Sequence, residues 1–156
     1  RCLLRCGADE DVVVVADSLL HLRLATMDEL ERWMAPAPAR TRSLLARTAA
    51  AESGLESIVR LRLRRHRIMV RTQVRIEDMR VDLVVGDALV IECDGGEHHR
   101  SWDSQAADRA RDRRLTVLGY RVIRLTYRQV IDDWPAVEQD ILALVRADAH
   151  RARRTR

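Results

Sequence analysis

The segment 80–99 reads RVDLVVGDALVIECDGGEHH. Its two apolar runs, 81–85 and 88–93, flank the turn pair Gly86-Asp87, and their short length and β-branched content predict two strands joined as a hairpin. The same runs carry three carboxylates, Asp82, Glu92 and Asp94. Burying carboxylates beside valine and isoleucine is costly unless a cation neutralises them. The hairpin is therefore the first candidate for a functional site.

The register of this hairpin decides whether the three acids share a face. Glu92 and Asp94 do, because side chains alternate along a strand. A three-residue loop at 86–88 sets Asp82 opposite Glu92, whereas a two-residue loop turns Asp82 to the other face. We expect the three-residue loop, because Gly86 suits the left-handed conformation that such loops use.

Three carboxylates converging on one spot make an oxygen-rich site suited to Mg²⁺ or Mn²⁺, without the imidazole and thiolate groups that zinc prefers. We therefore predict Asp82, Glu92 and Asp94 as metal ligands. The alternative for each acid taken singly is structural. Asp94 would open the Asp-Gly-Gly turn, and Asp82 would begin a strand at the surface.

Length and composition fit one domain, or a compact domain with a helical appendage. The 156 residues are 47% hydrophobic, which suffices for a core. No apolar run approaches the roughly 20 residues of a membrane span, and no secretory signal is visible, so we expect a soluble, cytoplasmic protein. Three cysteines fit neither a disulfide framework nor a paired zinc motif, and reduced thiols are expected. A start at Arg1 without methionine is consistent with a fragment.

The basic residues are unusual because the sequence contains no lysine. All 28 residues counted as lysine or arginine are arginine, and the net charge is +4. The arginine fork binds phosphate in a bidentate manner, which favours a nucleic-acid partner. Genome composition would produce the same bias, so the observation is weak by itself.

Residues 1–50 are predicted to form a helical appendage. Asp9 is expected to cap a first helix, although the four valines at 12–15 are also typical of a strand. Residues 26–29 have the spacing of a capping box, and 40–51 resume as an arginine- and alanine-rich helix after two prolines. These small helices read either as an adaptor without chemistry or as the end of a winged-helix unit.

Residues 53–147 predict an α/β domain, followed by a basic tail at 148–156. The expected elements are a helix from the capping box Ser53-Gly-Leu-Glu56 to Arg65, strands at 68–76, 81–85 and 88–93, a helix at 103–118 ended by Gly119, a strand at 120–127 and a helix starting near Pro135.

The helix predicted at 103–118 has a buried stripe that is apolar at one end only. Leu115 and Leu118 define the stripe. The residues that precede Leu115 on the same stripe, at spacings of three and four, are all polar: Arg111, Asp112, Asp108 and Ser104. Such a helix is expected to approach a polar cavity. Gln105 and Arg109, on a neighbouring face, either reach phosphate or, in the case of Arg109, join i to i+4 salt bridges with acidic neighbours.

The segment 53–145 resembles the PD-(D/E)XK nuclease superfamily, and most closely the domain-of-unknown-function family 559, which is similar to very-short-patch repair endonucleases. The residues that carry the resemblance are Glu56, Val81-Asp82-Leu83, Ile91-Glu92-Cys93-Asp94-Gly95 with His98, then Gln105, Asp108 and Arg111, and Gly119-Tyr-Arg-Val-Ile-Arg124. The resemblance implies a restriction-endonuclease-like α/β fold, with a mixed four-stranded sheet flanked by helices and an N-terminal helical appendage.

The resemblance also implies roles for individual residues. Asp82 and Glu92 would be metal ligands, and Glu56 a third acid acting directly or through water, unless it serves only its capping box. His98 would be a general base or a phosphate contact, the alternative being a solvated pair with His99. The residues implied to bind phosphate are Arg111 and Arg124.

One departure from the superfamily pattern concerns the lysine that normally follows the second acid by two residues. That position is Asp94 here. Asp94 would add a metal ligand, while His98 or Gln105 orients the water. The expected function is a Mg²⁺- or Mn²⁺-dependent DNA endonuclease. A catalytically inactive DNA-binding module and a toxin–antitoxin-type regulator on the same fold are the alternatives, and RNA as substrate and a homodimer remain open.

Overall fold

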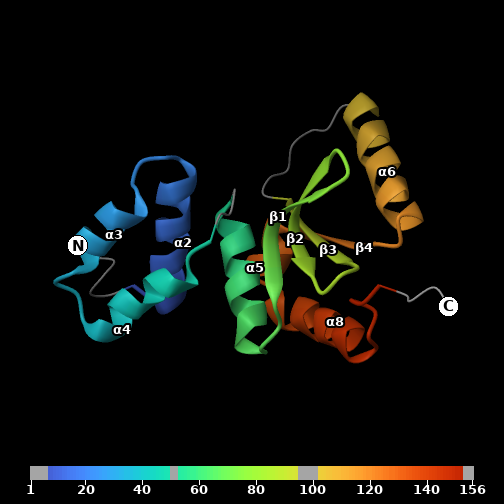
Figure 1. Ribbon diagram of the computed structural model, residues 1–156. Coiled ribbons are helices and arrows are strands. Elements are labelled where there is room, and N and C mark those ends of the chain that lie inside the picture. The colour runs from blue at the N-terminus through green and yellow to red at the C-terminus, as the bar shows by residue number, and fades with distance from the viewer. Residues whose placement is uncertain (1–6, 50–52, 95–101, 153–156) are drawn as a thin grey trace.

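A mixed four-stranded sheet lies at the centre of the molecule with helices on both faces, as the sequence predicts (Figure 1). The computed structural model describes residues 7–49, 53–94 and 102–152, and only the backbone of 102–105. The elements are, in chain order, α2 (Asp9–His21), α3 (Met27–Met34), α4 (Ala39–Arg42), the 3-10 helix η1 (Ser43–Arg47), α5 (Gly54–Arg65), β1 (Val70–Ile76), β2 (Met79–Val85), β3 (Leu89–Asp94), α6 (Trp102–Val117), β4 (Arg121–Thr126), α7 (Tyr127–Ile131) and α8 (Trp134–Arg146).

The strands follow the order β1-β2-β3-β4. The first three are antiparallel neighbours, and β4 runs parallel to β3. A parallel pair needs a long crossover, which here contains α6. Val85 pairs with Leu89, and Gly86 has a φ of 59°, so the predicted three-residue loop is confirmed.

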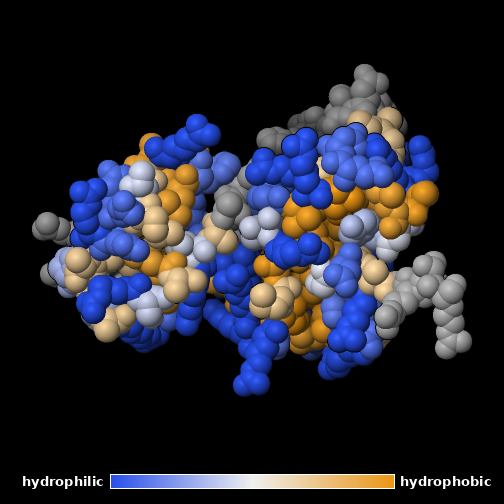
Figure 2. Space-filling view, in the orientation of Figure 1, coloured by the Kyte–Doolittle hydropathy of each residue, from blue (hydrophilic) through white to orange (hydrophobic). Residues whose placement is uncertain are grey.

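The two faces of the sheet are covered differently. Helices α5, α7 and α8 pack on one face, where the largest cluster of buried side chains includes Val59, Val130 and Ile141 with strand residues such as Leu83 and Ile91. On the other face, α6 contributes Leu115 to a smaller cluster. Figure 2 shows hydrophobic residues gathered over the strands, beneath a hydrophilic rim. Leu115 lies near the C-terminal end of α6, so the polar part of the helix that precedes it is available to face the acids of β3.

The N-terminal helices lie on the side of α5 away from the sheet (Figure 1). A fully buried ion pair joins them to α5, because Arg60 Nη2 lies 2.6 Å from Asp17 Oδ2, and the two side chains are 0% and 1% exposed. The Ser57 hydroxyl donates to the same carboxylate oxygen at 2.6 Å, and the Ala49 amide donates to the other at 2.9 Å. Helix α5 is thus shared between the appendage and the sheet.

Three expectations for the appendage are settled by the structure. The valines at 12–15 lie in α2 and not in a strand. Ala8, and not Asp9, is the N-cap of α2, and its amide donates to the Asp11 carboxylate at 3.2 Å. The capping box of Thr26 with Glu29 is confirmed, with the Thr26 amide 2.8 Å from the Glu29 carboxylate.

The helix predicted at 40–51 is shorter than expected. It breaks into α4 and η1, and the chain leaves η1 at Thr48. The hydroxyls of Ser43 and Thr48 donate to nearby carbonyls, at 2.6 Å and 2.7 Å. Such side-chain bonds compete with the helical ladder, which explains the early end.

The C-terminal elements agree with the expectations except for α7. Gly119, with a φ of 90°, ends α6, and the Tyr120 amide donates to the Leu115 carbonyl at 2.9 Å. The missed helix α7 begins at a capping box of Thr126 with Gln129, a spacing that the sequence displays. After α8, the His150 carbonyl accepts the amides of Asp87 and Ala88 and so fixes the β2–β3 turn.

No helix in the described ranges has the length and apolar character needed to cross a membrane.

Candidate functional site

Asp82 and Glu92 lie where β2 and β3 separate. Within the described residues, the pairing of these strands ends at Leu83 with Ile91. Beyond that point the Asp82 carboxylate accepts the Cys93 amide at 2.8 Å, in place of a backbone acceptor. A buried amide needs a partner, so this bond stabilises the opening of the strands and places Asp82 beside Glu92.

The Glu92 carboxyl lies in an environment that disfavours its ionised form. It is 5% exposed, and burial, followed by the negative charge and hydrogen bonding of Asp82, raises the pKa of Glu92 to about 7. Two carboxylates in one desolvated spot repel each other, and a cation between them would relieve both effects. The chemistry of this pair therefore fits a divalent metal.

Arg111 of α6 is the counter-charge to Glu92. Its Nη2 lies 2.8 Å from Glu92 Oε1, and the same nitrogen donates to the Arg80 carbonyl. The guanidinium lowers the pKa of Glu92, although less than burial and Asp82 raise it. The polar end of the α6 stripe thus meets Glu92 of β3.

Asp94, at the end of β3, is turned toward a different arginine. Its Oδ1 lies 3.7 Å from Arg124 Nη1, and the Arg124 fork makes two hydrogen bonds with Asp112 of α6, at 2.8 Å and 3.2 Å. These bonds with Asp112, against the cost of burial, raise the pKa of Arg124. Arg124 therefore links β3, β4 and α6, and its predicted contact with phosphate stays a prediction.

Glu56 reaches the site from the opposite side of the sheet. It is 2% exposed in the first turn of α5, and its Oε2 accepts the Gln73 side-chain amide at 2.7 Å. Burial and the charges of four carboxylates raise the pKa of the Cys93 thiol. These are, in order of effect, Asp82, Glu56, Glu92 and Asp94. All four predicted acids therefore lie near enough to Cys93 to interact electrostatically with its thiol.

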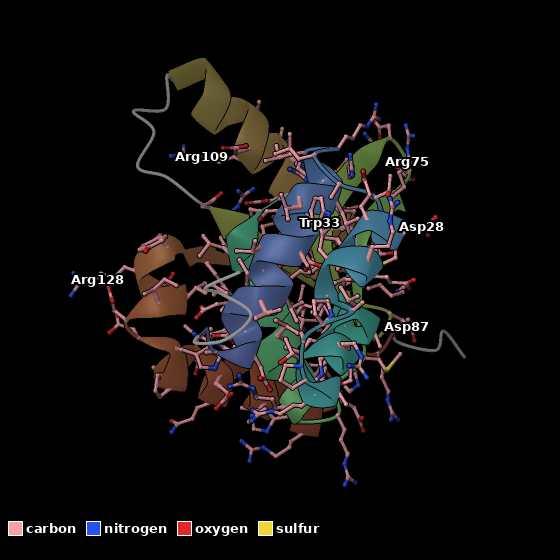
Figure 3. The ribbon with its side chains drawn as sticks, turned by 90° about the vertical axis from the view of Figure 1, so that its left-hand side faces the viewer. Asp28, Trp33, Arg75, Asp87, Arg109 and Arg128 are labelled. Carbon is pink, nitrogen blue, oxygen red and sulfur yellow. The ribbon has the colours of Figure 1, made fainter. Side chains whose placement is uncertain are left out.

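The remaining predicted residues are placed only in part. Arg109 is exposed on α6 and points to the same side of the molecule as Arg128 of α7 (Figure 3). His98 and the side chain of Gln105 lie outside the described residues.

The acids are adjacent but are not arranged as a ligand set. Among the side chains that the structure describes, no group of three or more His, Cys, Asp or Glu residues could hold a metal ion. Glu92 and Asp94 have arginine partners instead, and Asp82 accepts the Cys93 amide. The role of these three acids as metal ligands stays a prediction. Sequence reasoning missed Gln73, for which an amide within a predicted strand was the only signal.

Comparison with known proteins gives one family and one solved structure. The family model REase_MTES_1575, of a restriction endonuclease-like family, matches residues 55–145, which is more than half of the chain. The catalytic domain of the homing endonuclease I-Bth0305I is similar over 56% of this chain and 89% of its own, with 25% sequence identity and a TM-score of 0.49. None of the curated proteins matches. The finer resemblance to family 559 and to very-short-patch repair endonucleases remains a prediction.

Proposed function

Because the chain belongs to the restriction endonuclease-like family REase_MTES_1575, we propose that it is a divalent-metal-dependent endonuclease that hydrolyses phosphodiester bonds in DNA. The observation that carries the proposal is the pairing of Asp82 with the buried Glu92, where burial and then the negative charge of Asp82 raise the pKa of Glu92 to about 7. Replacing either acid would remove the unfavourable free energy of placing a buried carboxylate beside a second negative charge. The presence of both acids is therefore best explained by a bound cation.

Asp82 and Glu92 would hold the metal, with Mg²⁺ or Mn²⁺ as the candidates that suit oxygen ligands. When bound, such a metal would supply an activated water and would stabilise negative charge on the phosphate. The hydrogen bond from the Cys93 amide would hold the Asp82 carboxylate in place near Glu92. Asp94 is held by Arg124 and would act as a further acid near the pair.

The basic side chains of α6 would bind the substrate. Arg111 already lies against Glu92, and a cation in its place would release the guanidinium for a phosphate oxygen. Arg109 is exposed on the same helix and would contact the DNA backbone. His98 is the proposed proton acceptor or phosphate contact on the grounds of its sequence position alone.

The proposal is tested by nicking of supercoiled plasmid with Mg²⁺, Mn²⁺ or EDTA. We expect metal-dependent nicking by the wild type, and a loss of about 10²-fold or more in Asp82→Asn and Glu92→Gln. Asp87→Asn is the matched control, because Asp87 is an exposed carboxylate in the turn at the opposite end of β3. Nicking at the wild-type rate by Glu92→Gln would contradict the proposal.

The second candidate is a DNA-binding module on the same fold, favoured by the aspartate at the position of the superfamily lysine. This candidate predicts salt-sensitive DNA binding that neither metal nor the two substitutions change, with no nicking under any condition.

A further inference from the structure

Gln73 has an unusual backbone for a residue within a strand. Its φ is 51°, in the left-handed region that non-glycine residues rarely adopt. Thr72 pairs with Leu83 and Val74 with Val81, while the ladder skips Gln73. The residue across from this gap is Asp82, so the distortion lies directly beside the candidate site.

At this distortion, the side chains of β1 exchange the two faces of the sheet. Val70 packs in the cluster on the α5 side, whereas Val74 packs against the cluster on the α6 side. Residues four apart in a regular strand would share one face. The same exchange occurs in β2, where Leu83 packs on the α5 side and Val81 on the α6 side. The hairpin therefore changes faces at Gln73 and Asp82.

The change of faces gives the Gln73 side chain a specific partner. Its Nε2 donates to Glu56 Oε2 at 2.7 Å, and Gln73 is only half-buried whereas Glu56 is 2% exposed. Strained backbone persists where the surrounding structure holds it, and it concentrates at functional sites. The bond joins the first turn of α5 to the point where Asp82 begins the opening of the sheet.

We propose that Gln73 is a positioning residue of the nuclease site, which holds the Glu56 carboxylate beside Asp82 from the opposite side of the sheet. The inference rests on the proposed function and extends it to a residue that is not itself a proposed metal ligand. Gln73 acts through Glu56, because its side-chain amide fixes the direction of the buried Glu56 carboxylate.

Two substitutions separate this role from a purely structural one. Gln73→Asn keeps an amide and a residue that tolerates the left-handed region, but it is one methylene too short to reach Glu56. Gln73→Gly removes the side chain and relieves the backbone. Arg67→Gly is the matched control, because Arg67 is exposed, has a φ of 60° and lies in the connection after α5.

We expect Gln73→Asn and Gln73→Gly to nick plasmid about 10- to 100-fold more slowly than wild type in single-turnover reactions, with the dissociation constant for DNA unchanged within about twofold. Arg67→Gly should nick at the wild-type rate. A structural role alone predicts that Gln73→Gly, which relieves strain, is at least as active as the wild type, and this result would overturn the inference.

A readout besides activity is the NMR signal of the Gln73 side-chain amide. In the wild type we expect slowly exchanging amide protons, whose shift and protection are lost in Glu56→Ala. If the wild type does not nick, the proposed function fails, and this signal alone decides whether Gln73 holds Glu56. An amide signal that Glu56→Ala leaves unchanged would overturn the inference even in an active nuclease.

Discussion

Arg111 of α6 lies 2.8 Å from Glu92 of β3, and the carboxyl that it contacts is nearly excluded from solvent. A helix and a strand that are distant in sequence are thus joined through an ion pair at the candidate site. The pair is asymmetric, because Arg111 is half-buried and also donates to the Arg80 carbonyl. Glu92 keeps a raised pKa in spite of its partner.

The first prediction concerns the dependence of stability on pH. The pKa of Glu92 is about 7 in the folded state, against an ordinary value of 4.5. Below about pH 4.5, Glu92 is protonated in both the folded and the unfolded state and does not lower the free energy of unfolding. As the pH rises toward 7, the unfolded state ionises first and folding loses stability. Glu92→Gln should therefore gain stability relative to wild type between about pH 5 and pH 8, measured by urea denaturation. A gain in stability that is the same at about pH 5 and about pH 8, or that also appears in Asp87→Asn, would contradict a raised pKa at Glu92.

The second prediction concerns Arg111. Arg111→Met removes a positive charge that lowers the pKa of Glu92, so this pKa should rise further. Because metal binding needs an ionised carboxylate, the pH of half-maximal Mn²⁺ affinity should move up by about one unit, measured by calorimetry. Arg111→Lys keeps a charge and should restore part of the shift. An unchanged pH profile in Arg111→Met would show that the ion pair does not control Glu92.

The third prediction separates the two roles of Asp82. Asp82→Asn and Asp82→Ala both remove the charge, but asparagine keeps an oxygen for the Cys93 amide. We expect both variants to lose nicking, and Asp82→Ala to be less stable than Asp82→Asn by about 1–2 kcal/mol, because the amide is left without a partner. Thermal denaturation of the two variants measures the difference. Equal stability would mean that the bond does not hold the strands apart.

The fourth prediction concerns the buried ion pair of Asp17 with Arg60. Asp17→Ala leaves the Arg60 guanidinium buried without a counter-charge and should lower the free energy of unfolding by about 3–5 kcal/mol. The double variant Asp17→Leu with Arg60→Met should lose less than Asp17→Ala alone. A double-mutant cycle in urea tests this, and additive losses would contradict it. The same pair predicts that deleting residues 1–50 destabilises α5.

The fifth prediction concerns the surface that would face DNA. Arg109 and Arg128 project to one side of the molecule, and Asp87 lies toward the other side (Figure 3). Arg109→Ala should weaken DNA binding and reduce the slope of log affinity against log salt by about one. Arg146→Ala is the matched control, since Arg146 is an exposed arginine in the last turn of α8. Equal effects of the two substitutions would argue against a defined DNA-binding side.

Some properties of this protein follow from local sequence. The β-branched runs and the Gly86 turn determine the hairpin and its register, because a single glycine in the left-handed region fixes the loop length. This register places Asp82 and Glu92 next to the last pair of the ladder, Leu83 with Ile91. Capping residues likewise set the starts of α3 and α5, and Gly119 sets the end of α6.

Other properties depend on contacts between distant segments. Glu56 and Gln73 come together because β1 changes faces at a left-handed residue, which alternation along a regular strand cannot anticipate. Arg124 is bound by Asp112 because β4 brings it beneath α6. Sequence alone predicted which acids would form the candidate site. Tertiary structure decided that Arg111 faces Glu92 and Arg124 faces Asp94, because ion pairs form between whichever charges the packing of helix on sheet brings within reach.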